Sequence, residues 1–160
     1  MNPTVDEVYG WLEEVKDPEI PVLSLVDLGV ITHVSVDEEK VTVEMTPTFV
    51  GCPAMEHMKN EVEGVLKNRG IKNIAVNITF RKPWSSDLIS EKGKQSLKHF
   101  GLAPPPATKI FTDLEILETA ICPRCNGTNT ELKSPFGPTL CRAIFYCNLC
   151  KEAFEQFKPI

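Results

Sequence analysis

The sequence predicts an α+β fold in which a small three-stranded mixed sheet with packed helices is followed by a C-terminal zinc ribbon. Three observations lead to this prediction. A strand, strand, helix, strand pattern fills the first half of the chain, a proline-rich stretch follows residue 101, and two Cys-x-x-Cys pairs lie beyond it. A chain of 160 residues is long enough for one small domain and one smaller unit that a bound metal stabilises. We therefore predict a domain over residues 1–101, a linker over 102–118 and the ribbon over 119–160.

An N-terminal helix is indicated by its cap and by its apolar spacing. Thr4 and Glu7 have the pattern of a capping box, in which a hydroxyl and a carboxylate satisfy free backbone donors of the first turn. The apolar residues of this segment recur at helical spacing, namely Val5, Val8, Trp11, Leu12 and Val15. Pro18 and Pro21 end the helix because neither residue can donate a backbone hydrogen bond. The segment DPEIP is therefore a loop.

A β-hairpin, a helix and a third strand are expected next. Residues 29–36 are rich in β-branched side chains, and after an acidic turn apolar and polar residues alternate over 41–45. Helical spacing then extends from Met55 to Val65, with Gly70 placed to end the helix. Alternation over residues 74–80 predicts the third strand, and a strand–helix–strand crossover makes it parallel to the second. A further helix is expected over residues 88–100, ending at Gly101.

The charge and hydropathy of the chain exclude two classes of partner. There are 17 basic and 22 acidic residues, a formal net charge of −5, and no dense basic run. Nucleic-acid binding depends on clustered Lys and Arg, so we expect no nucleic-acid partner. No apolar run approaches the roughly 18 residues that a membrane span needs, and the first segment is acidic where a secretory leader would be basic. The sequence therefore predicts a cytoplasmic protein without a membrane partner.

Four cysteines form the most specific motif in the sequence. Cys122 and Cys125 make one Cys-x-x-Cys pair, and Cys147 and Cys150 make a second. Each pair presents two thiolates from one tight turn, and together they complete the tetrahedral shell of structural zinc. Iron in the same four-thiolate shell, as in an electron-transfer protein, stays open on the sequence alone. A fifth thiol, Cys141, is either a small buried residue or an additional functional thiol.

A lone thiol, Cys52, lies where the second strand leads into the following helix. Pro53 suits the first helical position, which would make Cys52 or a neighbour the cap, and a helix N-terminus favours the thiolate. Asp17 and Glu19 in the proline-fixed loop and Thr46 at the strand end would converge on this thiol and hold iron loosely. The ordinary alternative is an inert buried cysteine, an Asp17 that caps a turn and a Thr46 that serves only its strand.

Longer segments of the chain resemble a known family. They are DPEIPVLSLVDLGVI, TPTFVGCPAMEHM, PWSSDLI and HFGLAPP in the first part, and CPRC, SPFGPTLCRAIFYC, CNLC and EAFEQFK in the second. These segments resemble the PaaD (PaaJ) family of phenylacetate-degradation proteins, which are encoded with the phenylacetyl-CoA epoxidase. The first part is also similar to the wider SufT-like family associated with iron–sulfur cluster assembly. The resemblance therefore implies a SufT-like domain over residues 1–101.

The resemblance implies an accessory subunit or maturation factor of a multicomponent di-iron oxygenase, and not an enzyme that itself oxidises the substrate. The implied partners are the epoxidase subunits or their iron–sulfur reductase, and a homodimer is left open. The implied cofactors are structural zinc in the ribbon and transient iron or an iron–sulfur cluster at Cys52. The residues that carry these roles by position are Asp17, Glu19, Thr46, Cys52, the ribbon ligands Cys122, Cys125, Cys147 and Cys150, and Cys141 as a further thiol.

Two other functions stay open on the sequence alone. One is a rubredoxin-like electron-transfer subunit, with iron in the four-cysteine shell. The other is a structural adaptor that has no functional metal at Cys52. The sequence contains no Glu-x-x-His pair at helical spacing, no G-x-G-x-x-G motif and no P-loop, so the oxidative chemistry of such a system is expected on other subunits.

Overall fold

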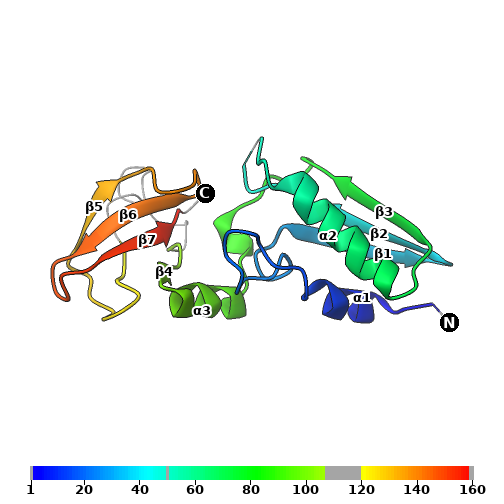
Figure 1. Ribbon diagram of the computed structural model, residues 1–160, viewed down its shortest axis with the longest axis horizontal. Coiled ribbons are helices and arrows are strands. Elements are labelled where there is room, and N and C mark those ends of the chain that lie inside the picture. The colour runs from blue at the N-terminus through cyan, green and yellow to red at the C-terminus, as the bar shows by residue number, and fades with distance from the viewer. Residues whose placement is uncertain (1, 50, 107–119, 159–160) are drawn as a thin grey trace. The chain divides into compact units, whose positions relative to one another are not determined.

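The computed structural model describes residues 2–49, 51–106 and 120–158, and it confirms the α+β fold (Figure 1). The chain divides into two compact units, Met1–Trp84 and Ser85–Ile160. The predicted boundary at residues 101 and 102 stays a prediction, which limited proteolysis of the full chain can test. Residues 107–118 of the expected linker lie outside the described residues.

The first unit contains the predicted mixed sheet. Its elements, in chain order, are α1 (Val5–Leu12), β1 (Ile31–Asp37), β2 (Lys40–Met45), α2 (Met55–Asn68) and β3 (Asn73–Ile78). The strand order is β1-β2-β3. β1 runs antiparallel to β2, and β3 runs parallel to it. Val43 of β2 lies opposite Val34 on one side and Val76 on the other, so the alternation read from the sequence sets the register of all three strands.

Helix α1 begins where the capping box predicts. Thr4 Oγ1 accepts a hydrogen bond from the Glu7 backbone N–H at 3.2 Å, and Glu7 Oε2 accepts one from the Thr4 backbone N–H at 2.8 Å. The helix ends at Leu12, before the Asp17 loop. Val5, at the first helical position, belongs to the predicted buried stripe but is 38% exposed.

The core of the first unit lies between the helices and one face of the sheet. Figure 1 shows α2 lying across this face, and α1 contacts both α2 and β1. The side chains that fill the space are apolar and almost fully buried: Val8, Leu12, Val41, Val43, Met45, Met58, Val62 and Leu66. Burial of this apolar surface is the main favourable term that holds the sheet and helices together.

The second unit is built around a four-stranded sheet. Its elements are η1 (Ser86–Leu88), α3 (Glu91–Phe100), β4 (Leu102–Ala103), β5 (Thr130–Ser134), β6 (Arg142–Cys147) and β7 (Ala153–Phe157). The strand order is β4-β7-β6-β5. The helix expected over residues 88–100 is shorter than predicted: Ser90 caps α3 through the Gly93 N–H at 2.9 Å, and Gly101 ends it at a φ of +93°.

Strand β4 differs from the sequence expectation. Leu102 and Ala103 fall at the start of the predicted linker, but they pair in parallel with Glu155 and Gln156 of β7. The pairing partner is far away in the sequence, so no local pattern indicates this strand. Inside the sheet the Phe145 and Phe154 rings stack with centroids 5.7 Å apart. In the part of the chain that the structure describes, no helix has both the length and the apolar character that crossing a bilayer requires.

Candidate functional site

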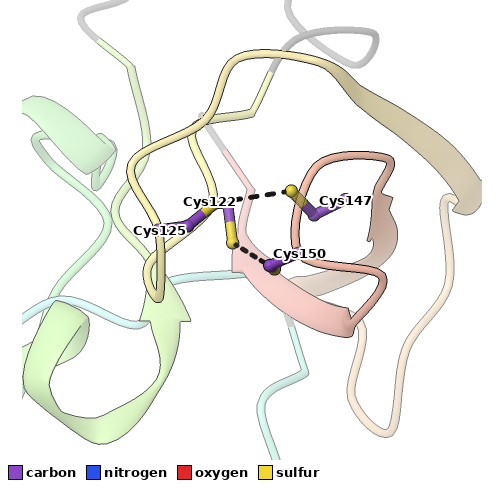
Figure 2. Close-up of side chains that lie close together, drawn as sticks. All are labelled: Cys122, Cys125, Cys147 and Cys150. Carbon is purple, nitrogen blue, oxygen red and sulfur yellow. Dashed lines mark hydrogen bonds between the residues drawn. The ribbon is translucent and has the colours of Figure 1, made fainter.

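The four predicted ribbon thiols lie together at one end of the ribbon sheet. All four sulfur atoms lie within 4.8 Å of one another. The Sγ atoms of Cys122 and Cys150 are 3.7 Å apart, and those of Cys125 and Cys147 are 3.6 Å apart (Figure 2). Four sulfurs around zinc at about 2.3 Å are separated by about 3.8 Å in a regular tetrahedron. The cluster therefore has the donor set and the size of a four-thiolate zinc site.

The two Cys-x-x-Cys loops repeat the same backbone geometry. Asn126 N–H donates to the Cys122 carbonyl at 2.9 Å, and Lys151 N–H donates to the Cys147 carbonyl at 3.0 Å. Asn126 and Lys151 each follow the second cysteine of their pair, and they adopt left-handed φ angles of 60° and 61°. A lysine rarely adopts this conformation. The matched turns aim two thiols from each loop at a common centre, as a tetrahedral metal requires.

Backbone donors in these loops favour the thiolate form. The Gly127 N–H donates to Cys125 Sγ at 3.4 Å. The backbone N–H groups of Cys150 and Leu149, together with neighbouring thiols, lower the pKa of Cys147 to about 7 although burial opposes the shift. Burial and the neighbouring thiols raise the pKa of Cys150 to about 12, and they also raise that of Cys125 although the Gly127 N–H opposes them. Metals bind the thiolate, so a cation that enters the cluster has to displace these protons.

Cys141 lies apart from the four-cysteine cluster. It precedes β6, whereas Cys147 ends that strand, so the length of β6 separates the two thiols. Cys141 is 8% exposed, and its Sγ lies 3.1 Å from the Thr139 hydroxyl. Within the described residues it does not belong to the group that can hold a metal ion. A functional role for Cys141 stays a prediction.

The lone thiol, Cys52, lies just before α2, but it is not the cap of that helix. Ala54 occupies the cap position and α2 begins at Met55, so the expectation that Pro53 starts the helix is wrong. The reason is a tight turn over residues 51–54, in which the Cys52 carbonyl accepts a hydrogen bond from the Met55 N–H at 3.3 Å. The Cys52 side chain is half-buried.

The pKa of Cys52 is raised, whereas a cap position at the helix N-terminus would have lowered it. Burial is the largest cause, and the carboxylates of Asp17 and Glu19 add to it. The backbone N–H groups of Ala54 and Met55 act in the other direction without offsetting these effects. Cys52 is therefore a protonated thiol at neutral pH, and the charges of the two carboxylates act on it. Within the described residues, the side chains that lie close enough to hold a metal ion together are those of the ribbon cluster, and Cys52, Asp17 and Glu19 do not form such a group.

The loop that carries these carboxylates is held by hydrogen bonds of its own. Asp17 Oδ1 accepts from the backbone N–H of Glu19 at 2.8 Å and of Ile20 at 2.9 Å. The Asp17 N–H donates to the Leu23 carbonyl at 2.9 Å. Asp17 thus caps a turn, as the ordinary interpretation predicts, and its charge also reaches Cys52.

Thr46 is a buried residue at the end of β2. Its backbone N–H donates to the Val30 carbonyl at 2.8 Å, and Val30 is hydrogen-bonded in turn to Leu25. Leu25 donates to the Val15 carbonyl at 3.0 Å, so this backbone ladder leads from the end of β2 to the start of the Asp17 loop. Thr46 is 2% exposed, and among the described residues its Oγ1 has no hydrogen-bond partner. A buried hydroxyl in this state costs free energy.

One buried polar pair is not among the residues predicted from the sequence. Ser24 Oγ donates to Asp27 Oδ2 at 3.0 Å and accepts from the Asp27 backbone N–H, also at 3.0 Å. The next residue, Leu28, accepts a hydrogen bond from Trp84 Nε1 at 2.9 Å. These bonds fix the segment between the Asp17 loop and β1. The signal that could have indicated the pair is a serine three residues before an aspartate.

Comparisons with known proteins match both parts of the chain. Residues 5–78 match the family described as iron–sulfur cluster assembly protein, and residues 107–158 match the PaaD zinc beta ribbon domain. The chain is 34% identical over 158 residues to an Escherichia coli (strain K12) protein whose name describes it as a component of 1,2-phenylacetyl-CoA epoxidase. That similarity covers 99% of this chain and 94% of the relative.

The first unit also has relatives that lack the ribbon. The chain is 39% identical over 85 residues to the Fe-S protein maturation auxiliary factor SufT of Staphylococcus aureus, covering 52% of this chain and 96% of the relative. A crystal structure of a Domain of Unknown Function DUF59 from Bacillus anthracis is similar with a TM-score of 0.54 and 33% identity, over 57% of this chain and 89% of that one. The chain therefore belongs to the PaaD-like family, in which an iron–sulfur cluster assembly domain is followed by a zinc ribbon.

Proposed function

We propose that this chain is an accessory maturation factor of a phenylacetyl-CoA epoxidase, a multicomponent di-iron oxygenase, and that it assists the assembly of iron or iron–sulfur centres. The chain is similar along almost its whole length to a protein named as a component of such an epoxidase, which supports the assignment to this oxygenase. Similarity of the first unit to Fe-S protein maturation auxiliary factors supports the role. In this proposal the protein acts in the cytoplasm and does not oxidise the substrate.

The observation that carries the proposal is the surroundings of Cys52. This thiol is half-buried and lies within the electrostatic reach of Asp17 and Glu19. Carboxylates and a thiol are ligands that iron accepts. An incoming cation replaces the thiol proton, and the carboxylate charges favour the cation. A single sulfur with oxygen neighbours holds a metal more weakly than four thiolates do, which suits cargo that has to be released.

The ribbon has the opposite role in this proposal. Its four thiols form a closed shell, which leaves no open position for a substrate. Bound zinc would stabilise the strands that carry these cysteines, because a small unit gains much of its folding free energy from its metal. The ribbon then docks the protein on its oxygenase partners, while the metal of the ribbon stays in place.

The test is co-expression of this chain with the epoxidase subunits and their iron–sulfur reductase. Cys52→Ser is compared with wild type and with Cys141→Ser, which makes the same chemical change at a buried thiol outside the four-cysteine cluster. We expect Cys52→Ser to keep wild-type folding and zinc content but to leave the oxygenase poor in iron. Normal iron incorporation with Cys141→Ser would show that the effect belongs to Cys52, and it would also remove the predicted functional role of Cys141. Full maturation by Cys52→Ser would contradict the proposal.

The same samples separate the two other functions. Elemental analysis and an absorption spectrum of anaerobically purified protein identify the metal in the ribbon. Iron in the ribbon, with reversible reduction, would indicate an electron-transfer subunit instead. A silent Cys52→Ser together with a damaging Cys125→Ser would indicate a structural adaptor.

A further inference from the structure

The segment that follows β3 contains an exposed aromatic residue and two exposed cations. Phe80 is 62% exposed, and the next two residues, Arg81 and Lys82, are exposed as well. Within the part of the chain that the structure describes, neither cationic side chain has a hydrogen-bond or ion-pair partner. Arg81 contributes only its backbone N–H, which donates to Thr79 Oγ1 at 3.2 Å. Aromatic residues and arginine are enriched at protein interfaces, so this segment has the composition of a contact surface.

The segment is held in place at both of its ends. Before it, the Thr79 N–H donates to the Met45 carbonyl at 2.8 Å. After it, Trp84 is 5% exposed, and its indole N–H donates to the Leu28 carbonyl at 2.9 Å. Residues 80–82 are therefore fixed against the first unit before any partner arrives, and a preformed surface loses less conformational entropy on binding.

These anchors place the segment at the edge of the sheet that leads to Cys52. Met45 is the last residue of β2, and the chain continues from there through Thr46 to Cys52. Because β2 and β3 run parallel, with Met45 opposite Ile78, the residues that follow both strands leave the sheet at this same edge. Neither cation is among the groups that shift the pKa of Cys52, so the surface borders the site without acting on the thiol.

The charge of this segment differs from that of the unit around it. In residues 1–84 acidic side chains outnumber basic ones, so most of this unit repels an acidic partner. Two adjacent cations without ion-pair partners attract such a partner to their own edge. Proteins that hold a di-iron centre through glutamate side chains carry several uncompensated carboxylates before the metal arrives, which gives the empty site a negative potential.

We propose that Phe80, Arg81 and Lys82 form the surface on which the metal-free di-iron subunit of the oxygenase docks. This inference rests on the proposed function, and it adds which partner receives the cargo and which edge of this chain faces that partner. The cations steer the approach of the negatively charged subunit, and the aromatic ring packs against it. Bound iron neutralises part of the negative charge, so the filled subunit is attracted less and leaves. This contact is additional to that of the ribbon.

The test measures binding of the zinc-loaded full chain to the purified metal-free di-iron subunit by biolayer interferometry, at low and at high ionic strength. Arg81→Gln/Lys82→Gln removes both charges. The matched control Lys40→Gln/Lys72→Gln makes the same change in net charge at the opposite end of the sheet, where Lys40 begins β2 and Lys72 precedes β3. We expect the first pair to slow association about tenfold at low ionic strength and less at high, and the control pair to behave as wild type.

Two further measurements separate the ring from the charges. Phe80→Ser should accelerate dissociation about tenfold, because the loss of an interface aromatic acts mainly on the dissociation rate. Iron-loaded di-iron subunit should bind wild type about tenfold more weakly than the metal-free subunit, and Arg81→Gln/Lys82→Gln should bind both forms alike. The changed side chains are exposed, so these variants should keep the melting temperature of wild type.

Co-expression distinguishes failure of this inference from failure of the proposed function. Cys52→Ser should bind the di-iron subunit as wild type does and leave it poor in iron. If Cys52→Ser fails in maturation while Arg81→Gln/Lys82→Gln binds and matures the subunit normally, the docking surface alone is overturned. Normal maturation by Cys52→Ser overturns the proposed function, and with it the cargo role of this surface. No binding of wild type to the di-iron subunit, an equal effect of the control pair, or charge-dependent binding to the iron–sulfur reductase instead would also overturn the inference.

Discussion

The four-cysteine cluster and the Cys52 site use the same side chain under contrasting conditions. In the cluster each thiol has three sulfur neighbours within 4.8 Å, and backbone N–H groups donate to the sulfurs. Around Cys52 the neighbours are carboxylates, and the thiol holds its proton. Without a metal, burial and the neighbouring thiols raise the pKa of Cys150 to about 12, and that of Cys125 is raised as well, so a bound cation is what holds four thiolates in a closed shell. At Cys52 a single neutral thiol exchanges its proton for a cation. The neighbours of a cysteine, rather than the cysteine itself, separate a permanent site from a transient one.

Removal of the ribbon metal should have the largest effect on stability. It also tests most directly whether the ribbon depends on its metal while the first unit does not. Structural zinc contributes an apparent binding free energy of about 10–16 kcal/mol, much of which is folding free energy. We expect a chelator to abolish amide protection in β5, β6 and β7 while β1, β2 and β3 keep theirs. Hydrogen exchange followed by mass spectrometry on the full chain measures both regions at once. Unchanged protection of residues 130–157 without metal would show that the ribbon does not need its cluster.

The contrast between the two sites also separates what the sequence could and could not predict. The ribbon thiols were predictable because a Cys-x-x-Cys turn is a local structure that places both of its sulfurs. The mixed sheet was predictable because alternation along each strand fixes which residues face the core. The shift of the Cys52 pKa was predicted in the wrong direction, because it depends on burial and on carboxylates from a distant loop. Strand β4 was missed for the same reason, since only its partner β7 defines it.

Gly127→Ala tests whether close packing around Cys125 contributes to the zinc affinity of the ribbon. A Cβ at this position would lie 2.5 Å from Leu149 Cδ1 and 3.1 Å from Cys125 Sγ. The exposed Leu149 side chain can move, but a metal-bound sulfur cannot, so we expect a loss of about 1–3 kcal/mol in the stability of the metal-bound ribbon. Competition with a chromophoric chelator measures the corresponding loss of zinc affinity.

The control for this variant is Gly64→Ala in α2. A Cβ there meets nothing within 4 Å, so alanine should stabilise the helix by about 0.5–1 kcal/mol and leave zinc affinity unchanged. If Gly127→Ala retained zinc as tightly as Gly64→Ala does, close packing around Cys125 would not be part of the cluster.

Thr46→Val tests whether the buried Thr46 hydroxyl lowers the stability of the first unit. The change replaces a buried hydroxyl, which has no partner among the described residues, by a methyl group of similar size. We expect stability to rise by about 1 kcal/mol in urea unfolding, because the unsatisfied group is removed. Iron incorporation into the co-expressed oxygenase should fall if the hydroxyl serves the cargo. A variant that is more stable and fully active would assign Thr46 to the strand alone.

Asp17→Asn should have the smallest effect of these substitutions. It tests whether the carboxylate charge of Asp17 acts on the Cys52 thiol, since the ribbon thiols have sulfur neighbours instead. The Asp17 carboxylate raises the pKa of Cys52, so its removal lowers that pKa and increases the thiolate fraction at any pH below it. Asparagine keeps an oxygen that can accept the backbone hydrogen bonds from Glu19 and Ile20, so the turn should persist. Because the thiolate is the nucleophile, and becomes slightly less nucleophilic as its pKa falls, we expect alkylation of Cys52 to accelerate about twofold.

The measurement is the rate of iodoacetamide modification of the Cys52 peptide between pH 7 and 9, in zinc-loaded protein. Glu61→Gln is the matched control, since it removes one exposed carboxylate that is not among the groups that shift the Cys52 pKa. The acceleration should be constant while the thiol of both proteins stays mostly protonated, and it should become smaller only as the pH approaches the raised pKa of Cys52. A pH profile identical to that of Glu61→Gln would mean that the Asp17 charge does not act on the thiol, and the proposed metal-release site would lose one of its two carboxylates.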